Sequence, residues 1–338
     1  MRWSLTAPFL LSLLCFHGSV SAQSAAPPAD PPPVRIGPLL LTGYVQFDYL
    51  GTGDEPPFDE PPLQDDETEP RDFRLRRVRF QLAGPLTTGV KWAVSAEATS
   101  QPVLRDAYVI LDFLPAATIR AGQFVMPYSH ERFVASSNTM EFTERILVDL
   151  APGRDAGVMV SNERPFFGWL SYGAGITNGT GQNTRDDNRA KDAMVRLSAA
   201  PQRLPGLQLA VNIAGGHQPE GMRTRVGGDV RFENRLYHVG GEFLRERTQD
   251  GKAEQDGFYA FGSWRFYPQV QRRGFHHLEL AVRYARLSGD VTDVRQWDLA
   301  VNYYVHRTLR FMCDVIVPDG RDALYDGTIL HTRANFRF

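Results

Sequence analysis

The residues with the clearest chemistry are four arginines on one short segment: Arg74, Arg76, Arg77 and Arg79. A guanidinium group stays protonated and presents a planar fork of donors that matches phosphate and carboxylate oxygens. Several such groups along a channel wall select anions electrostatically. Alternatively, acidic residues such as Glu97 or Asp106 neutralise these arginines. The sequence leaves both interpretations open.

Other chemically interesting groups are weaker candidates. Ser129, His130 and Glu131 lie close together and include nucleophile and base types, but no nucleophile elbow surrounds a serine, so we expect no enzyme and no catalytic residue. His276 and His277 are adjacent, which in a strand directs the two rings to opposite faces and prevents joint chelation. We therefore expect no metal site and no cofactor.

The segments that must position the arginines have the period-two alternation of strands from residue 39 onward. In the last segment, for example, Leu330 and Phe336 share one face while His331 and Arg333 share the other. An apolar outer face opposite a polar inner face, repeated in pieces of about ten residues, is typical of an outer-membrane barrel. The chain also ends on Phe338, which resembles the terminal aromatic signal of such barrels.

The alternation predicts an all-β fold, a transmembrane antiparallel β-barrel of about 16 strands. We place the strands, to within about four residues at each end, at 39–50, 73–84, 89–99, 104–113, 117–126, 155–163, 168–178, 190–200, 206–215, 224–232, 235–247, 256–267, 276–287, 295–305, 309–317 and 327–338. With a periplasmic N-terminus, the long connections 51–72, 127–154 and 179–189 lie outside and short ones such as 85–88 lie inside.

The same alternation orients the arginine run. Three apolar residues mark the outward face of its second half: Val78, Phe80 and Leu82. Arg77 and Arg79 then point inward, as they should, because an arginine at mid-depth on the lipid face costs roughly 2–4 kcal/mol. Phe73 and Leu75 have the opposite parity, and a β-bulge at this change brings the other two arginines inward as well.

Two of the long connections have distinct compositions. Residues 51–72 contain nine acidic residues and five prolines, which predicts a stiff, solvated loop. Residues 127–154 carry apolar side chains such as Phe142 and Leu147, so we expect this third outside loop to fold into the pore. Arg132 and Arg145 lie on this loop and join the predicted anion pathway.

Composition and the N-terminal segment together predict the cellular compartment of the protein. A 42% apolar content and a mean hydropathy of −0.32 exclude a helical membrane bundle, and a net charge of −2 argues against nucleic acid as a partner. Residues 1–22 have the parts of a secretory signal peptide, 23–38 form a Pro/Ala-rich periplasmic lead-in, and 39–338 form the barrel. The predicted location is the outer membrane of a Gram-negative bacterium, with its lipid as one partner.

Several motifs together resemble the phosphate-selective porins O and P. They are Phe73 to Arg79, Asp106-Ala107-Tyr108, Gly122 to Tyr128, Ser136-Ser137, Phe142 to Arg145, Gly153 to Val158 and Asn178-Gly179. The resemblance covers most of the mature chain. It implies a sixteen-stranded homotrimeric channel whose third loop narrows the pore and whose solute is a small inorganic anion, phosphate or polyphosphate.

The resemblance also implies roles for individual residues. By motif, the family's arginine pair matches Arg76 and Arg77, its aspartate matches Asp106, and its serines match Ser136 and Ser137. The family's loop lysine has no counterpart here. The third loop contains no lysine, and Arg132 lies beside the equivalent position. This departure and the acidic loop 51–72 leave a general or other-solute porin as the alternative, with a barrel receptor or adhesin as the next.

Overall fold

The computed structural model describes most of the barrel and not the N-terminal segment. The described residues are 33–52, 72–101, 103–114, 116–134, 141–186, 189–218, 221–248, 254–268, 274–290, 293–306, 308–320 and 327–338. The predicted signal peptide, most of the acidic connection 51–72, and the serines Ser136 and Ser137 lie outside these residues.

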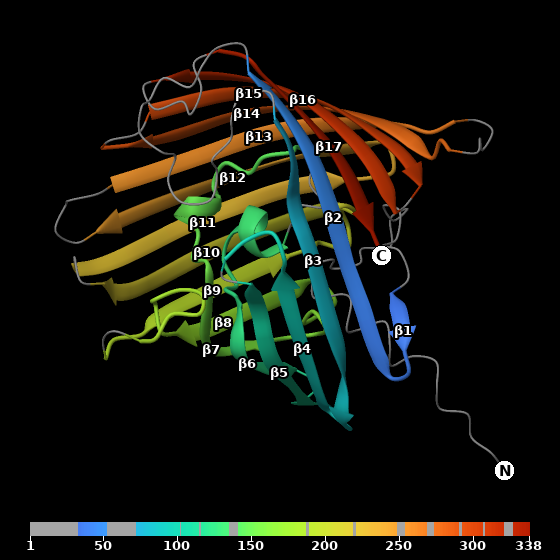
Figure 1. The fold of residues 1–338 in the computed structure, drawn as a ribbon. Coiled ribbons are helices and arrows are strands. Elements are labelled where there is room, and N and C mark those ends of the chain that lie inside the picture. Colours follow the sequence, from blue (N-terminus) through green and yellow to red (C-terminus); the bar gives the residue numbers. More distant parts are fainter. Residues whose placement is uncertain are drawn as a thin grey trace.

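Sixteen long strands in the described part of the chain form one closed antiparallel barrel (Figure 1). They are β2 (Leu39–Thr52), β3 (Asp72–Thr87), β4 (Val90–Glu97), β5 (Leu104–Leu114), β6 (Ala117–Val125), β7 (Arg154–Ser161), β8 (Leu170–Thr177), β9 (Asp192–Ala199), β10 (Leu207–Gln218), β11 (Gly221–Glu233), β12 (Tyr237–Thr248), β13 (Glu254–Phe266), β14 (His277–Gly289), β15 (Asp293–His306), β16 (Leu309–Gly320) and β17 (Ile329–Arg337). Each pairs with the next, and β17 pairs with β2 from Arg337 and Tyr44 to Ile329 and Thr52, which closes the ring. The predicted fold class is confirmed, and each predicted strand corresponds to an observed one.

Two details differ from the expectation. A short strand, β1 (Val34–Ile36), lies within the predicted lead-in and pairs with residues 39–41 of β2. The pairing of β17 with β2 begins only at Tyr44, so β1 covers backbone groups that would otherwise form a free edge. Residues 85–87, expected in a turn, continue β3 as far as Thr87, with an irregularity in the pairing after Pro85.

Outward and inward faces alternate as a membrane barrel requires. On β15, Leu299 and Val301 point outward and are 53% and 44% exposed, whereas Asp298 and Asn302 point inward and are fully buried. A water-soluble protein would bury the aliphatic side chains instead. The apolar outer surface therefore faces lipid, and the polar residues line the inside.

Two β-bulges break this alternation near the arginines. On β3, Gln46 pairs with Arg77 and Phe47 pairs with Leu75, so Arg76 is the extra residue. On β5, Ser95 pairs with Asp106 and Ala96 pairs with Leu104, so Arg105 is the extra residue. The first bulge was predicted and the second was not. Each adds one arginine beyond what strict alternation would direct inward.

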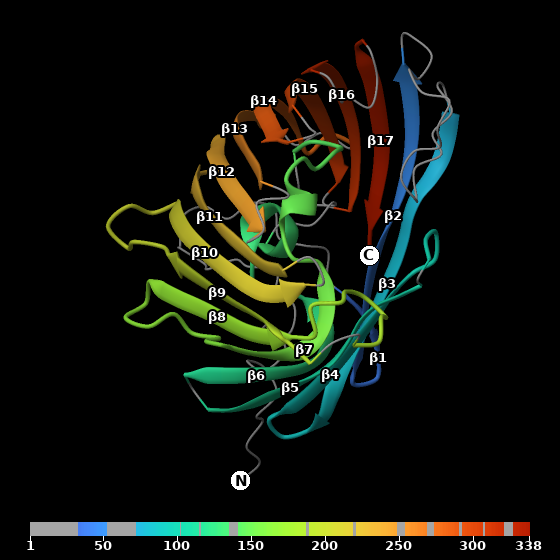
Figure 2. The ribbon, with the colours of Figure 1, turned by 90° about the vertical axis from the view of Figure 1, so that its left-hand side faces the viewer.

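The connection between β6 and β7 packs against the inner wall. It contains two helical turns, η1 (Ser129–Val134) and η2 (Val148–Leu150), and Figure 2 shows this green segment surrounded by strands. Its apolar residues Tyr128 and Leu147 are fully buried in a cluster with Leu244 of β12 and Tyr259 of β13. No helix among the described residues is long and apolar enough to span a membrane.

Candidate functional site

The bulge at Arg76 divides the arginine run between two neighbourhoods. Arg79 lies against Glu97 of β4, with its Nη2 at 2.8 Å and its Nε at 3.0 Å from Oε2, while Nη1 of Arg77 is 4.0 Å from the same oxygen. Arg74 is instead the cross-strand neighbour of Asp48 on β2. The four predicted arginines therefore do not form one ladder.

Glu97 neutralises one of these arginines. It is 1% exposed, and it also accepts hydrogen bonds from the Val78 backbone N–H and the Thr99 hydroxyl. Its two oxygens are therefore fully used, with Arg79 as the close ionic partner. The neutralised alternative holds for Arg79.

Asp106 is paired with an arginine from outside the run. Arg154 of β7 donates from Nε at 2.9 Å to Oδ1 and from Nη2 at 3.3 Å to Oδ2, and the Ser95 hydroxyl also donates to Oδ2. Its neighbour Arg105 is brought to the inner side by the bulge but makes no ion pair with this aspartate. Asp106 thus sets the position of Arg154 and leaves Arg105 unneutralised.

The two loop arginines lie close to those of the wall. Burial, followed by the charge of Arg154, lowers the pKa of Arg132 to about 10, with further contributions from Arg105 and Arg77 and an opposing one from Asp149. Burial and neighbouring cations both lower the pKa of a guanidinium, and here the arginines of the wall add to the effect of burial.

Arg145 has the same kind of environment. Burial lowers its pKa to about 10, Glu131 and Tyr44 oppose the shift, and Arg132 and Arg79 add to it. The loop arginines and the wall arginines therefore share one electrostatic neighbourhood.

We define the arginine cluster as six residues: Arg77, Arg79, Arg105, Arg132, Arg145 and Arg154. In the described structure, only Glu97 and Asp106 lie within ion-pair distance of any of them. The Nε–H groups of Arg105, Arg132 and Arg145 are buried without an acceptor among the described residues. Six cations against two carboxylates give the cluster an excess of positive charge among the described residues.

Five arginines elsewhere on the inner wall are paired closely. Arg196 lies 2.7 Å from Asp229, Arg283 lies 2.8 Å from Asp298, and Arg265 lies 2.8 Å from Glu279. Arg333 lies 2.6 Å from Asp48, and Arg225 pairs with Glu246. Each of these five has a carboxylate partner, unlike Arg105, Arg132 and Arg145 of the arginine cluster among the described residues.

A second feature is the segment Glu141–Glu144 of the same loop, which we call the strap. Its backbone carbonyl groups accept hydrogen bonds from Asn302 of β15, Arg283 of β14 and Arg333 of β17. The backbone N–H and hydroxyl of Thr143 both donate to Asp314 of β16. Four consecutive strands thus anchor the strap to the inner wall.

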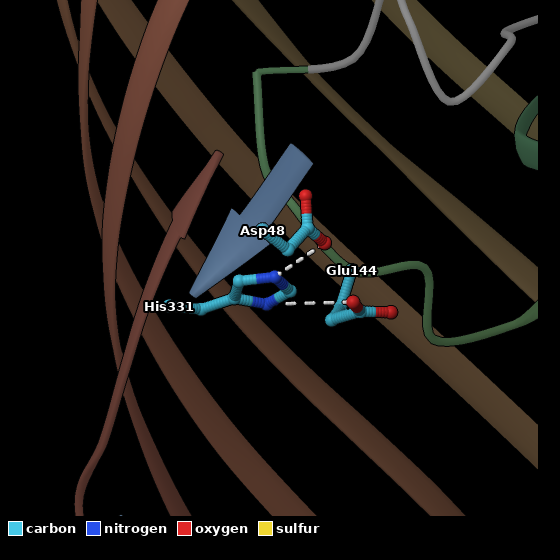
Figure 3. Close-up of side chains that lie close together, drawn as sticks. All are labelled: Asp48, Glu144 and His331. Atoms are coloured by element: carbon cyan, nitrogen blue, oxygen red, sulfur yellow. Dashed lines mark hydrogen bonds and ion pairs between the residues drawn. The ribbon is translucent and has the colours of Figure 1, made fainter. Parts of the chain in front are cut away.

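One end of the strap completes a group of residues with metal-ligand atoms. Asp48, Glu144 and His331 offer one ligand atom each, all within 4.8 Å of one another (Figure 3). Arg333 already supplies a cation there, since its Nη2 lies 2.6 Å from Oδ2 of Asp48 and 3.7 Å from Oε1 of Glu144. A divalent ion would have to displace this guanidinium, so the group is an ion-pair network and not a metal site.

Sequence reasoning missed Arg105 and the pairing around His331. The sequence holds a signal for Arg105, because the outward-facing Leu104 and Ala107 are three positions apart instead of two. Leu75 and Val78 show the same spacing around the bulge that was predicted. No comparable signal exists for His331, whose partner Asp48 is 283 positions away in sequence.

Comparison with known proteins shows similarity in both sequence and fold. The sequence model of the family described as phosphate-selective porin O and P matches residues 58–239 and 216–338. No curated protein matches the chain.

Solved structures share the barrel. The outer-membrane channel DcaP of Acinetobacter baumannii matches with a TM-score of 0.62 at 10% identity, covering 89% of this chain and 97% of that one. An anion-selective porin from Comamonas acidovorans gives 0.60 at 14% identity, with 89% and 99% covered. OmpT of Vibrio cholerae in its trimer form gives 0.59 at 10% identity, with 89% and 99% covered. At these identities the likeness concerns the fold.

Proposed function

Because the chain belongs to the family of phosphate-selective porins O and P, and is a channel of the Gram-negative outer membrane, we propose that it conducts small anions, with phosphate or polyphosphate as the preferred solute. The observation that carries this proposal is the arginine cluster. Three of its members, Arg105, Arg132 and Arg145, have no carboxylate within ion-pair distance among the described residues.

The electrostatics of the cluster favour anions on entry without holding them irreversibly. An anion about 4 Å from one guanidinium gains on the order of 4 kcal/mol at an effective dielectric constant of about 20, and loss of hydration offsets part of this gain. Conduction requires that an ion enter readily and leave readily, which several moderate sites achieve better than one strong site. Cations from strands β3, β5 and β7 and from the loop between β6 and β7 supply such a series.

We further propose that the loop between β6 and β7 narrows the pore and that anions pass between its arginines and the β3–β7 wall. The strap supports this arrangement, because its bonds to β14–β17 hold one edge of the loop on the opposite side of the barrel. Arg132 and Arg145 then face the wall arginines across the path. The predicted contribution of Ser136 and Ser137 adds neutral donors to the same path.

The experiment that tests the proposal is a reversal-potential measurement on the purified channel in a planar bilayer under a KCl gradient. We expect an anion-selective potential for the wild type and its loss, or inversion to cation preference, in R105A/R132A/R145A. The matched control is R203A, which removes an exposed arginine from the turn between β9 and β10. A triple variant with unchanged selectivity would contradict the assignment of the cluster.

Titration with phosphate separates phosphate preference from general anion conduction. We expect added phosphate to reduce the KCl current of the wild type and to have a much weaker effect on the triple variant. An anion-selective channel that phosphate does not block would be a general anion porin, and the phosphate part of the proposal would be wrong.

We also propose that the channel assembles as a homotrimer, as the family and the trimeric OmpT suggest. Chemical crosslinking in outer-membrane vesicles tests this. A ladder that ends at three subunits is expected, and a monomer alone would contradict it.

A further inference from the structure

The two glutamates of the strap each meet a buried histidine of the wall. Oε1 of Glu141 lies 2.6 Å from Nδ1 of His238 on β12, and Oε1 of Glu144 lies 3.4 Å from Nδ1 of His331 on β17. The histidines are 7% and 0% exposed, so both are buried. The strap is therefore fixed at both ends by carboxylate–imidazole contacts.

We propose that His238 is a positioning residue that holds the strap in its protonated form, while His331 marks the fixed other end, so that the strap is anchored at neutral and acidic pH and loosened at alkaline pH. This regulation rests on the proposed function to the extent that the strap borders the proposed anion path. It concerns the width and steadiness of that path and not the choice of ion.

His331 lies between a carboxylate of the wall and one of the strap. Its Nε2 lies 2.8 Å from Oδ2 of Asp48, while its Nδ1 faces Glu144, so both ring nitrogens point at carboxylate oxygens (Figure 3). The contact with Asp48 is a hydrogen bond, whereas Nδ1 forms none among the described residues.

Further charged groups surround this end of the strap. The charged groups that face His331 or Glu144 come from four strands: Asp48 on β2, Arg76 on β3, Asp314 on β16 and Arg333 on β17. Arg333 contacts both Asp48 and Glu144, so one guanidinium is shared by two carboxylates. This permanent cation holds the Glu144 end of the strap at any pH of interest.

His238 has a comparable setting at the other end of the strap. Its ring packs edge-on against Phe261 with centroids 4.8 Å apart, which fixes Nδ1 toward Glu141. Other charged or titratable groups face the pair from four elements: Arg231 and Glu233 on β11, Arg265 on β13, Tyr304 on β15 and His130 in η1. Burial alone would raise the pKa of Glu141, but His238 and Arg265 outweigh it and lower the pKa to about 2. The glutamate therefore stays ionised, and the histidine is the partner that titrates.

Deprotonation would loosen the strap without releasing it completely. The hydrogen bonds from Asn302, Arg283 and Arg333 to the strap carbonyl groups do not depend on histidine protonation. If the contacts with the strap favour the protonated imidazole about tenfold over the neutral one, deprotonation multiplies the fraction of channels with a loosened strap by about ten. The expected sign is a transition that appears as pH rises through and above the ordinary histidine range, which is centred near 6.5.

The test is single-channel recording in symmetric KCl at a series of values from about pH 5.5 to about pH 9.5, a range that brackets histidine titration. We expect the open-channel noise of the wild type to rise severalfold across the range. H238Q should be noisy throughout and lack the transition, because glutamine donates one hydrogen bond but carries no titrating charge. The matched control H306Q alters an exposed histidine and should keep the wild-type profile.

A second variant covers the case in which H238Q does not fold. E141Q leaves the wall unchanged and removes the strap carboxylate that faces His238, and it should also abolish the transition. A wild type whose noise does not change with pH, or a folded E141Q channel that keeps the wild-type profile, would overturn the proposal. A channel with this pH transition but without anion preference would instead contradict the proposed function and leave the strap inference intact.

Discussion

The barrel uses arginine in two contrasting ways. On β9–β17, five inward arginines lie against carboxylates, as Arg283 does with Asp298 at 2.8 Å. In the arginine cluster, six guanidiniums share two carboxylates within ion-pair distance among the described residues. The first arrangement stabilises the wall and the loop, and the second is the one that we propose acts on a solute.

The difference depends on backbone geometry as much as on composition. The bulge at Arg105 brings two consecutive residues, Arg105 and Asp106, to the inner side. Asp106 would be expected to neutralise its neighbour, but Arg154 and Ser95 already occupy its oxygens. A single extra residue in one strand thus adds a cation without adding the acid that would cancel it.

The largest expected effect comes from breaking a pair. Arg283 is 1% exposed, bonds Asp298 and the Glu144 carbonyl, and lies 4.4 Å from the centre of the Phe142 ring. Removing one partner of a buried pair leaves the other charge uncompensated, so R283A should lower the free energy of unfolding by about 3–5 kcal/mol. Urea unfolding in lipid vesicles measures this change.

The paired replacement R283Q/D298N is the control for that measurement. It removes both charges and keeps hydrogen-bonding groups of similar size, so we expect it to destabilise the barrel less than R283A. If R283A costs no more than the double replacement, the uncompensated Asp298 is not the source of the loss. The distinction between paired and unneutralised arginines would then lose its energetic basis.

The sequence was sufficient for the barrel because the inside-out alternation repeats in every strand. It was also sufficient for the bulge at Arg76, where Leu75 and Val78 reveal the change of parity. It was insufficient for ion pairing, since Arg154 and Asp106 are 48 positions apart and meet only through the register of β5, β6 and β7. Which arginines remain unneutralised is thus decided by three-dimensional pairing that residue types alone do not specify.

The next effect concerns the acid side of the strap. The pKa of Glu141 falls from 4.5 to about 2 on folding, so its contribution to stability is complete above pH 4.5 and is lost as the pH falls toward 2. A shift of this size corresponds to on the order of 3 kcal/mol. The wild type should therefore lose stability between these values more steeply than E141Q, measured by urea unfolding at a series of pH values.

The control E163Q changes a glutamate in the turn after β7 and should retain the wild-type dependence of stability on pH. If E141Q showed the same dependence as the wild type, Glu141 would not be held ionised by its partners.

The smallest effect on stability should accompany a clear effect on selectivity. Arg105 has no carboxylate partner to leave behind and lies among other cations, so R105A should change the free energy of unfolding by less than about 1 kcal/mol, in contrast to R283A. The same substitution should reduce the anion preference in a KCl gradient, and R105K should largely restore it because the charge remains. A large loss of stability in R105A would place this arginine with the paired ones of β9–β17. The combination of near-neutral stability and reduced anion preference would show instead that its charge acts on the solute and not on the fold.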